Sequence, residues 1–137
     1  MARTASAIPV YHGQKIDTME CSYGGWAVSG NCVHLYVERN LGVHKNTEHL
    51  FHRHDEFGVG HCILSFGQTQ RFRGKVSLYK FGEKPGTEFS GETILWEQKL
   101  SEDCDGLIEY GAAGVMLHPF GWTDWTVFAK SFELIIL

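Results

Sequence analysis

Long apolar runs are missing from this chain of 137 residues. A membrane-spanning helix needs about 18 or more consecutive apolar residues, whereas the run that ends the chain covers only Leu134 to Leu137. Residues 1–10 also lack the apolar stretch of about 7 to 15 residues found in secretory signals. We therefore expect a protein that is not inserted into a membrane and is either cytoplasmic or released without a signal peptide.

Clusters of basic residues are missing as well. The chain carries 12 Lys and Arg against 16 Asp and Glu, which gives a formal charge of −4. Because nucleic-acid binding needs a basic face that neutralises phosphates, nucleic acid is not an expected partner. Hydrophobic residues make up 43% of the chain and charged residues 20%, a composition that predicts one folded domain over residues 1–137.

The usual motifs of catalysis and phosphate binding are not found either. There is no Gly-x-Ser-x-Gly elbow, and the glycines after Tyr23 are not followed by the Lys-Ser or Lys-Thr of a phosphate-binding loop. No catalytic residue is therefore predicted, and the sequence favours a protein that is not an enzyme.

Cysteine is sparse and irregularly spaced. Cys21, Cys32, Cys62 and Cys104 lie too far apart for a zinc-finger pair or a thioredoxin-like motif. Free thiols are the expectation when no export signal is present. A Cys21–Cys32 disulfide is the alternative, because a turn near Gly30 can bring the flanking strands together.

Alternation of apolar and polar residues is the strongest pattern present. In Cys32 to Glu38, every second residue is apolar, so Val33, Leu35 and Val37 are predicted to face a core. Residues 62–66 and 76–81 are apolar on both sides, which is typical of central strands. Further strands are predicted at 94–98, 107–110 and 115–118.

Two further expectations concern the C-terminal third. Residues 111–114, Gly-Ala-Ala-Gly, are predicted to form a flexible corner between two strands. Residues 125–137 are predicted to form one tail buried inside a sheet, with Phe128, Phe132 and Leu134 on a common face. Short strands separated by glycine-rich turns indicate an all-β, single-domain antiparallel β-sandwich or jelly roll, with a small β-barrel as the alternative.

Eight histidines supply one functional hypothesis. In an extended strand His52 and His54 point to the same face, with Glu56 continuing on it. Together with His61 or His118 they would give a ligand set suited to a divalent transition metal such as zinc. The competing interpretation is a polar loop with solvated histidines and no cofactor. Residues 51–58 are similar to the His-x-His strand of copper-zinc superoxide dismutases and cupins, but neither family's remaining ligand motifs are present.

Aromatic residues supply the leading hypothesis. Trp122, Asp124 and Trp125 lie in a predicted loop, and Tyr23 with Trp26 forms a second cluster. An indole can stack on a sugar ring while a neighbouring carboxylate accepts hydrogen bonds from its hydroxyls. We therefore expect a lectin-like, non-catalytic binding module for a carbohydrate or another small polar ligand. The alternatives are burial of these aromatics in the core, a metal-dependent enzyme or metal-binding protein that uses the histidines around residues 52–61, and an assembly subunit that forms a homo-oligomer.

Overall fold

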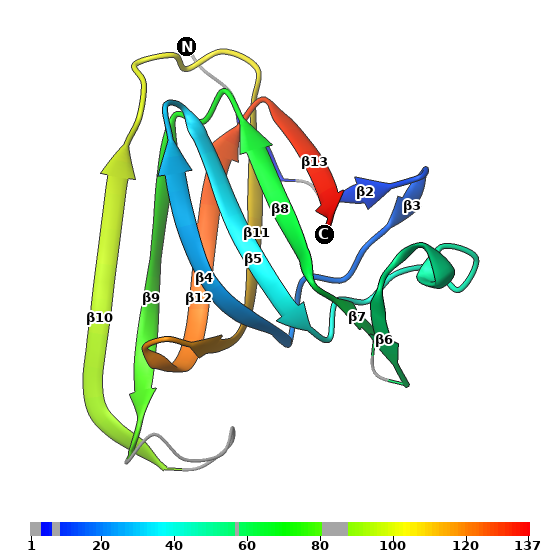
Figure 1. Cartoon of the computed structure of the whole chain (residues 1–137). Helices are drawn as coiled ribbons and strands as arrows, with labels where there is room; N and C mark the ends of the chain where they lie inside the picture. The colour runs from blue at the N-terminus through cyan, green and yellow to red at the C-terminus, as the bar shows by residue number, and fades with distance from the viewer. Residues whose placement is uncertain (1–3, 7–8, 57, 81–87) are drawn as a thin grey trace.

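The computed structural model describes residues 4–6, 9–56, 58–80 and 88–137, and its regular structure is almost entirely β-strand (Figure 1). The all-β class is confirmed. The 3-10 helix η1 (Glu48–Leu50) is a single turn, and within the described ranges no helix has the length and apolar character needed to span a membrane. The strands are β1 (Thr4–Ser6), β2 (Val10–Tyr11), β3 (Gln14–Lys15), β4 (Cys21–Ser29), β5 (Cys32–Arg39), β6 (Arg53–Asp55), β7 (Gly58–Gly60), β8 (Cys62–Gly67), β9 (Arg71–Tyr79), β10 (Phe89–Lys99), β11 (Leu107–Leu117), β12 (Phe120–Ala129) and β13 (Ser131–Ile136).

One large sheet contains most of these strands and folds over into two layers. Its strand order is β10-β9-β12-β11-β4-β5-β8-β13, and β1 pairs with β11 beside this path. In Figure 1 the strands β4, β5 and β8 lie in front of β11 and β12, while β9 and β10 extend to the left and β13 lies to the right of β8. The arrangement is that of a β-sandwich in which the two layers remain hydrogen-bonded to each other along one side.

The two layers meet where β11 and β4 pair in parallel. Gly114 lies opposite Cys21 and Met116 lies opposite Tyr23. A Cβ on Gly114 would overlap the backbone carbonyl of Cys21, so only glycine allows this close approach. The predicted corner at 111–114 is therefore wrong. These residues lie inside one continuous strand, β11. Gly114 is needed there because it lets β11 and β4 approach each other closely, and not because the chain must be flexible.

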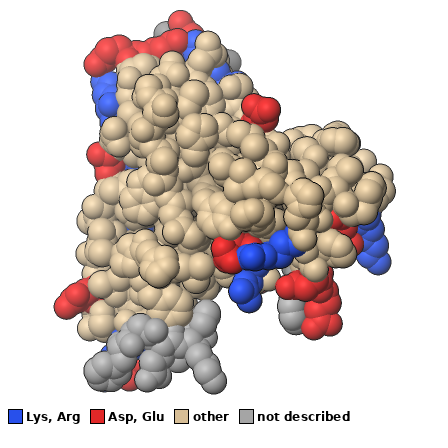
Figure 2. Space-filling view, in the orientation of Figure 1, with Lys and Arg blue, Asp and Glu red and all other residues tan. Residues whose placement is uncertain are grey.

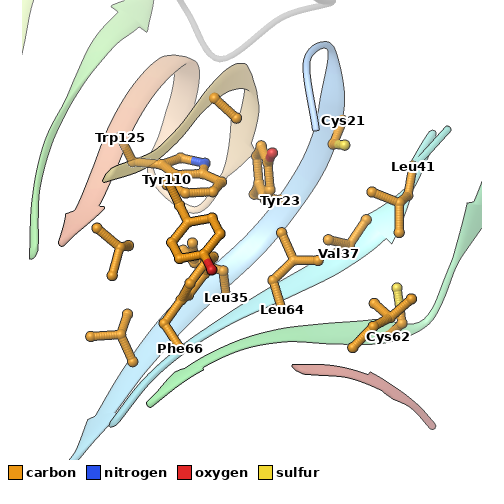
Figure 3. Packing of buried hydrophobic residues seen from close by; sticks show 14 of the residues in the cluster. Cys21, Tyr23, Leu35, Val37, Leu41, Cys62, Leu64, Phe66, Tyr110 and Trp125 are labelled. Atoms are coloured by element: carbon orange, nitrogen blue, oxygen red, sulfur yellow. The ribbon is translucent and has the colours of Figure 1, made fainter. Parts of the chain in front are cut away.

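A single aromatic-rich core fills the space between the layers (Figure 3). Phe66 on β8 packs against Trp125 on β12, in the facing layer, with ring centroids 5.7 Å apart. Phe66 also contacts Tyr110 at 5.1 Å and Phe132 at 5.3 Å. The predicted core face of β5 is confirmed, because Val33, Leu35 and Val37 are each fully buried.

The C-terminal segment is divided between the layers. β12 ends at Ala129, and β13 begins at Ser131 in the other layer, where it pairs with β8 along one edge. The prediction of one continuous tail inside a sheet is wrong. The alternation of buried side chains shifts at Lys130. Before it, the odd-numbered residues Val127 and Ala129 face the core, and after it the even-numbered Leu134 does.

All four cysteines are free thiols, as expected. Cys21 begins β4 and Cys32 begins β5, and the hairpin pairs Ser29 with Cys32 at its turn. Because the strands run in opposite directions, Cys21 lies at the far end of the hairpin from Cys32. The alternative of a disulfide between them is therefore wrong.

Charged side chains are unevenly placed on the face of the molecule that Figure 2 shows. Lys, Arg, Asp and Glu lie mainly around the rim of this face, and one group of adjoining red and blue atoms lies below its largely uncharged centre. Among the described residues visible there, basic and acidic side chains are interspersed and form no broad basic patch.

Candidate binding site

Three neighbouring strands of one layer, β10, β9 and β12, form the floor of a groove. Their register places three side chains in each of two rows across the sheet. Side chains alternate between the faces of a strand, and Trp125 between them points into the core, so both rows point outward. The first row is Leu95, Lys75 and Asp124, and the second is Glu97, Arg73 and Thr126.

The groove between these rows is shallow and open to solvent. Its volume is ≈ 390 Å³, within the range of about 300–1,000 Å³ typical of small-molecule sites. The lining also includes Gly74, Trp96 and Trp125. The side chains of both tryptophans lie on the inner face of the sheet, so the backbone of these three residues forms the floor of the groove. The indole of Trp96 covers Gly74 on the opposite, inner face of the sheet.

The charged groups of the groove differ in whether they already have partners. Nε of Arg71 lies 3.4 Å from a carboxylate oxygen of Glu97, and the guanidinium of Arg73 lies 5.4 Å from the ring centre of Phe128. Lys75 is directly opposite Asp124, and both are exposed. Within the described residues neither of these two side chains forms a hydrogen bond or an ion pair. The ammonium and the carboxylate are therefore available to a ligand.

The predicted aromatic cluster at 122–125 is divided between two faces. Residues 120–129 form strand β12, so the expected loop is wrong. Trp122 and Asp124 point outward, but Trp125 points inward and is only 2% exposed. Trp125 packs edge-on against Tyr23, with ring centroids 5.8 Å apart. Its indole is therefore part of the core, and it is the backbone of Trp125 that lines the groove.

Trp122 remains close to the groove without lining it. It lies opposite Ser77 on the outer face, one row from the pair formed by Lys75 and Asp124. Successive residues on one face of a strand are about 7 Å apart. The half-buried indole of Trp122 therefore borders one end of the groove.

The second predicted cluster also divides. Tyr23 is fully buried, and its hydroxyl donates a hydrogen bond of 2.5 Å to the backbone carbonyl of Thr18. Burial raises the pKa of this hydroxyl well above its usual value. Trp26 is 37% exposed and stacks on Trp96 of the facing layer, with ring centroids 4.4 Å apart and planes 16° apart. Tyr23 is therefore structural, and Trp26 closes an edge of the sandwich.

The histidines lie in separate parts of the fold. His52 precedes β6 and His54 is within it, and both are exposed along with Glu56. His61 lies between β7 and β8, while His118 lies in the turn between β11 and β12, in the other layer. Among the residues that the structure describes, no three His, Cys, Asp or Glu side chains come close enough to hold a metal ion.

His61 belongs instead to a polar chain on the outer face of β5. The hydroxyl of Tyr36 donates to Glu38 at 2.9 Å and lies 3.0 Å from Nδ1 of His61. A hydroxyl has one proton, so Nδ1 of His61 donates to Tyr36 in this arrangement. Arg53 forms an ion pair with Glu38. The hydrogen bond from Tyr36 and the charge of Arg53 hold the pKa of Glu38 below its ordinary value.

Sequence reasoning missed most of the groove. Arg71, Arg73 and Lys75 alternate with the buried Phe72 and with Gly74, a pattern that predicts a strand with a basic outer face. The predicted strand at 76–81 omits residues 71–75, which belong to β9. The pairing that brings Leu95 and Asp124 to either side of Lys75 depends on a strand order that no local pattern shows.

Comparisons with protein families, with curated proteins and with solved structures find no match to this chain. The fold and the groove are therefore the observations from which a function is inferred.

Proposed function

We propose that this chain is a non-catalytic binding module that recognises a carbohydrate or another small, hydroxyl-rich ligand in the groove on β9, β10 and β12. One observation carries the proposal. Lys75 and Asp124 lie directly opposite each other at the centre of the groove, are exposed, and have no partner among the described residues.

The chemistry of this pair suits a neutral ligand with several hydroxyl groups. An ammonium offers three hydrogen-bond donors and a carboxylate offers only acceptors, whereas each sugar hydroxyl both donates and accepts. Hydrogen bonds to charged groups are stronger than those between neutral groups. Leu95 adds an apolar surface beside Lys75 that the C–H groups of a sugar ring can contact.

The groove favours binding over catalysis. Its described carboxylates, Glu97 and Asp124, project from β10 and β12, with β9 between them. Glu97 already pairs with Arg71. Hydrolysis of a glycosidic bond generally uses two carboxyl groups as an acid and base or nucleophile pair, and the described lining of the groove offers no second unpaired carboxylate to work with Asp124.

The test is a panel of neutral mono- and oligosaccharides measured by isothermal titration calorimetry against four proteins. These are the unmodified chain, Asp124→Asn, Lys75→Met, and a control, Asp105→Asn, which removes an exposed carboxylate outside the groove. A lost hydrogen bond to a charged group costs about 1.5–3 kcal/mol, so each groove variant should bind about 10- to 100-fold more weakly. The control should bind normally.

Two results would overturn the proposal. One is the failure of every saccharide to bind at millimolar concentration. The other is binding that survives both groove substitutions unchanged, because the site must then lie elsewhere. Circular dichroism of each variant confirms that the fold is retained, which is expected because both side chains are exposed.

A further inference from the structure

β10 ends the strand order of the large sheet, and its second edge pairs with no strand that the structure describes. Within the described residues it pairs only with β9. Apolar side chains are exposed on both of its faces, with Leu95 74% exposed on the outer face and Ile94 42% exposed on the inner face. In Figure 1 the strand lies at the left margin of the molecule, with no other element beyond it.

Edge strands normally carry features that prevent pairing with another chain. Bulges, prolines, lysines in the middle of the strand and very short length are the common ones. The irregularity in β10 is confined to the stretch between Phe89 and Thr93, and residues 93–99 keep an unbroken register with β9. That stretch contains one lysine, at its end, and no proline. The edge is therefore open to a partner strand.

β13, at the other end of the sheet, differs in this respect. Its Leu134 is buried, Ile135 and Ile136 are half-buried, and only Leu137, beyond the strand, is an exposed large apolar residue. Of the two end strands, β10 therefore carries more exposed apolar surface, so it is the favoured edge for a contact between chains.

We propose that β10 pairs in antiparallel fashion with β10 of a second copy of this chain, about a two-fold axis perpendicular to the sheet that passes beside Leu95. Such an axis leaves the outer faces of both copies on the same side. A residue therefore faces a partner residue of the same face. Leu95 faces the partner's Leu95 on the outer side, and Ile94 faces the partner's Trp96 on the inner side.

The side chains along β10 are complementary in this register. In the regular stretch 93–99, Leu95 and Ile94 each face an apolar residue, and no two like charges are opposite. Thr93 faces the partner's Glu97, so its hydroxyl can donate to that carboxylate, and symmetry repeats the interaction on the other side of the axis. Apolar cross-strand pairs are stabilising and opposed like charges are destabilising.

Neighbouring two-fold registers fit less well. An axis at Ile94 places Trp96 opposite the partner's Glu92 and Leu95 opposite Thr93. An axis at Trp96 places Leu95 opposite the partner's Glu97 and Ile94 opposite Gln98. Both registers leave Leu95, the most exposed large apolar residue of the strand, against a polar group.

The experiment is sedimentation velocity of the full chain over a wide concentration range, without added ligand. The expected species is a dimer with twice the 15.5 kDa mass of the chain. Leu95→Lys and Leu95→Glu should each be monomeric, because each places like charges opposite each other at the axis. Mixing these two variants should restore a dimer. The control, Met19→Lys, changes an apolar residue that is 52% exposed outside β10 and should remain dimeric.

The outcomes separate cleanly. A monomer at every concentration, or a dimer that survives Leu95→Lys, overturns the proposal. If both charged variants are monomeric but their mixture stays monomeric too, the register is wrong and the proposal fails. Species that grow beyond a dimer with concentration overturn the two-fold geometry. None of these results depends on saccharide binding, so this proposal and the proposed function succeed or fail separately.

Discussion

The contact between β11 and β4 gives a sharp test of the fold, because it depends on one missing methyl group. Gly114→Ala places a Cβ against the backbone carbonyl of Cys21, where relief requires the strands themselves to move apart. Gly111→Ala on the same strand is the matched control, since its Cβ would meet the carbonyl of Trp125 at 3.3 Å and is otherwise exposed. Neither glycine has a positive φ, so alanine is compatible with both backbones.

The magnitudes follow from two opposing effects. Overpacking a well-packed interior costs about 1–3 kcal/mol, while replacing glycine with alanine at a compatible backbone stabilises by about 0.4–1 kcal/mol through the unfolded state. Gly114→Ala should therefore lower the free energy of unfolding by roughly 1–2 kcal/mol or more, because its clash is with backbone. Gly111→Ala should change it by about 0.5 kcal/mol or less, as surface substitutions do.

Urea unfolding followed by tryptophan fluorescence measures both variants, since buried Trp125 reports on the core. The comparison also distinguishes the strand from the flexible corner that the sequence suggested. In a flexible corner, alanine at Gly111 and Gly114 would have similar small effects. Equal unfolding free energies for the two variants would therefore contradict the parallel contact between β11 and β4.

Two further predictions concern titratable groups. Burial raises the pKa of Cys21 and of Cys62 to about 12. At neutral pH a thiol reagent should therefore label exposed Cys104 rapidly, and should label Cys21 and Cys62 only after denaturation. Rapid labelling of Cys21 or Cys62 in the folded protein would contradict their burial. The pKa of Glu38 is lowered by the hydrogen bond from Tyr36 and by a neighbouring positive charge. Its contribution to stability is therefore present above the ordinary glutamate pKa and is lost as pH falls through the lowered value. Unfolding curves of Glu38→Gln and the unmodified protein should differ at neutral pH and converge in acid, and a difference independent of pH would refute this role.

The alternation pattern predicted strands well where one face is buried and the other is polar. β5 is the clearest case, since Val33, Leu35 and Val37 alternate with His34 and Tyr36 and are all in the core. Period-two alternation reflects the geometry of a single strand, so no knowledge of neighbouring strands is needed.

The pattern failed where a residue's role depends on a partner strand. The sequence of β11 alone predicts a flexible residue at Gly114, because the close approach to Cys21 depends on the pairing with β4. Trp122 and Trp125 are chemically identical and three residues apart, so composition gives both the same expectation. Strand geometry separates them, because positions an odd number apart point to opposite faces.

The groove and the open edge of β10 share one residue, and this connects the two proposals physically. Leu95 lines the groove and faces its symmetry mate in the proposed dimer. An axis perpendicular to the sheet places both grooves on the same side of one continuous surface, separated by the two Leu95 side chains. A ligand with two sugar units of suitable spacing could then occupy both grooves, and the second contact would gain from its high effective concentration. Leu95→Lys should therefore weaken binding of a longer oligosaccharide more than that of a monosaccharide, whereas Asp124→Asn should weaken both.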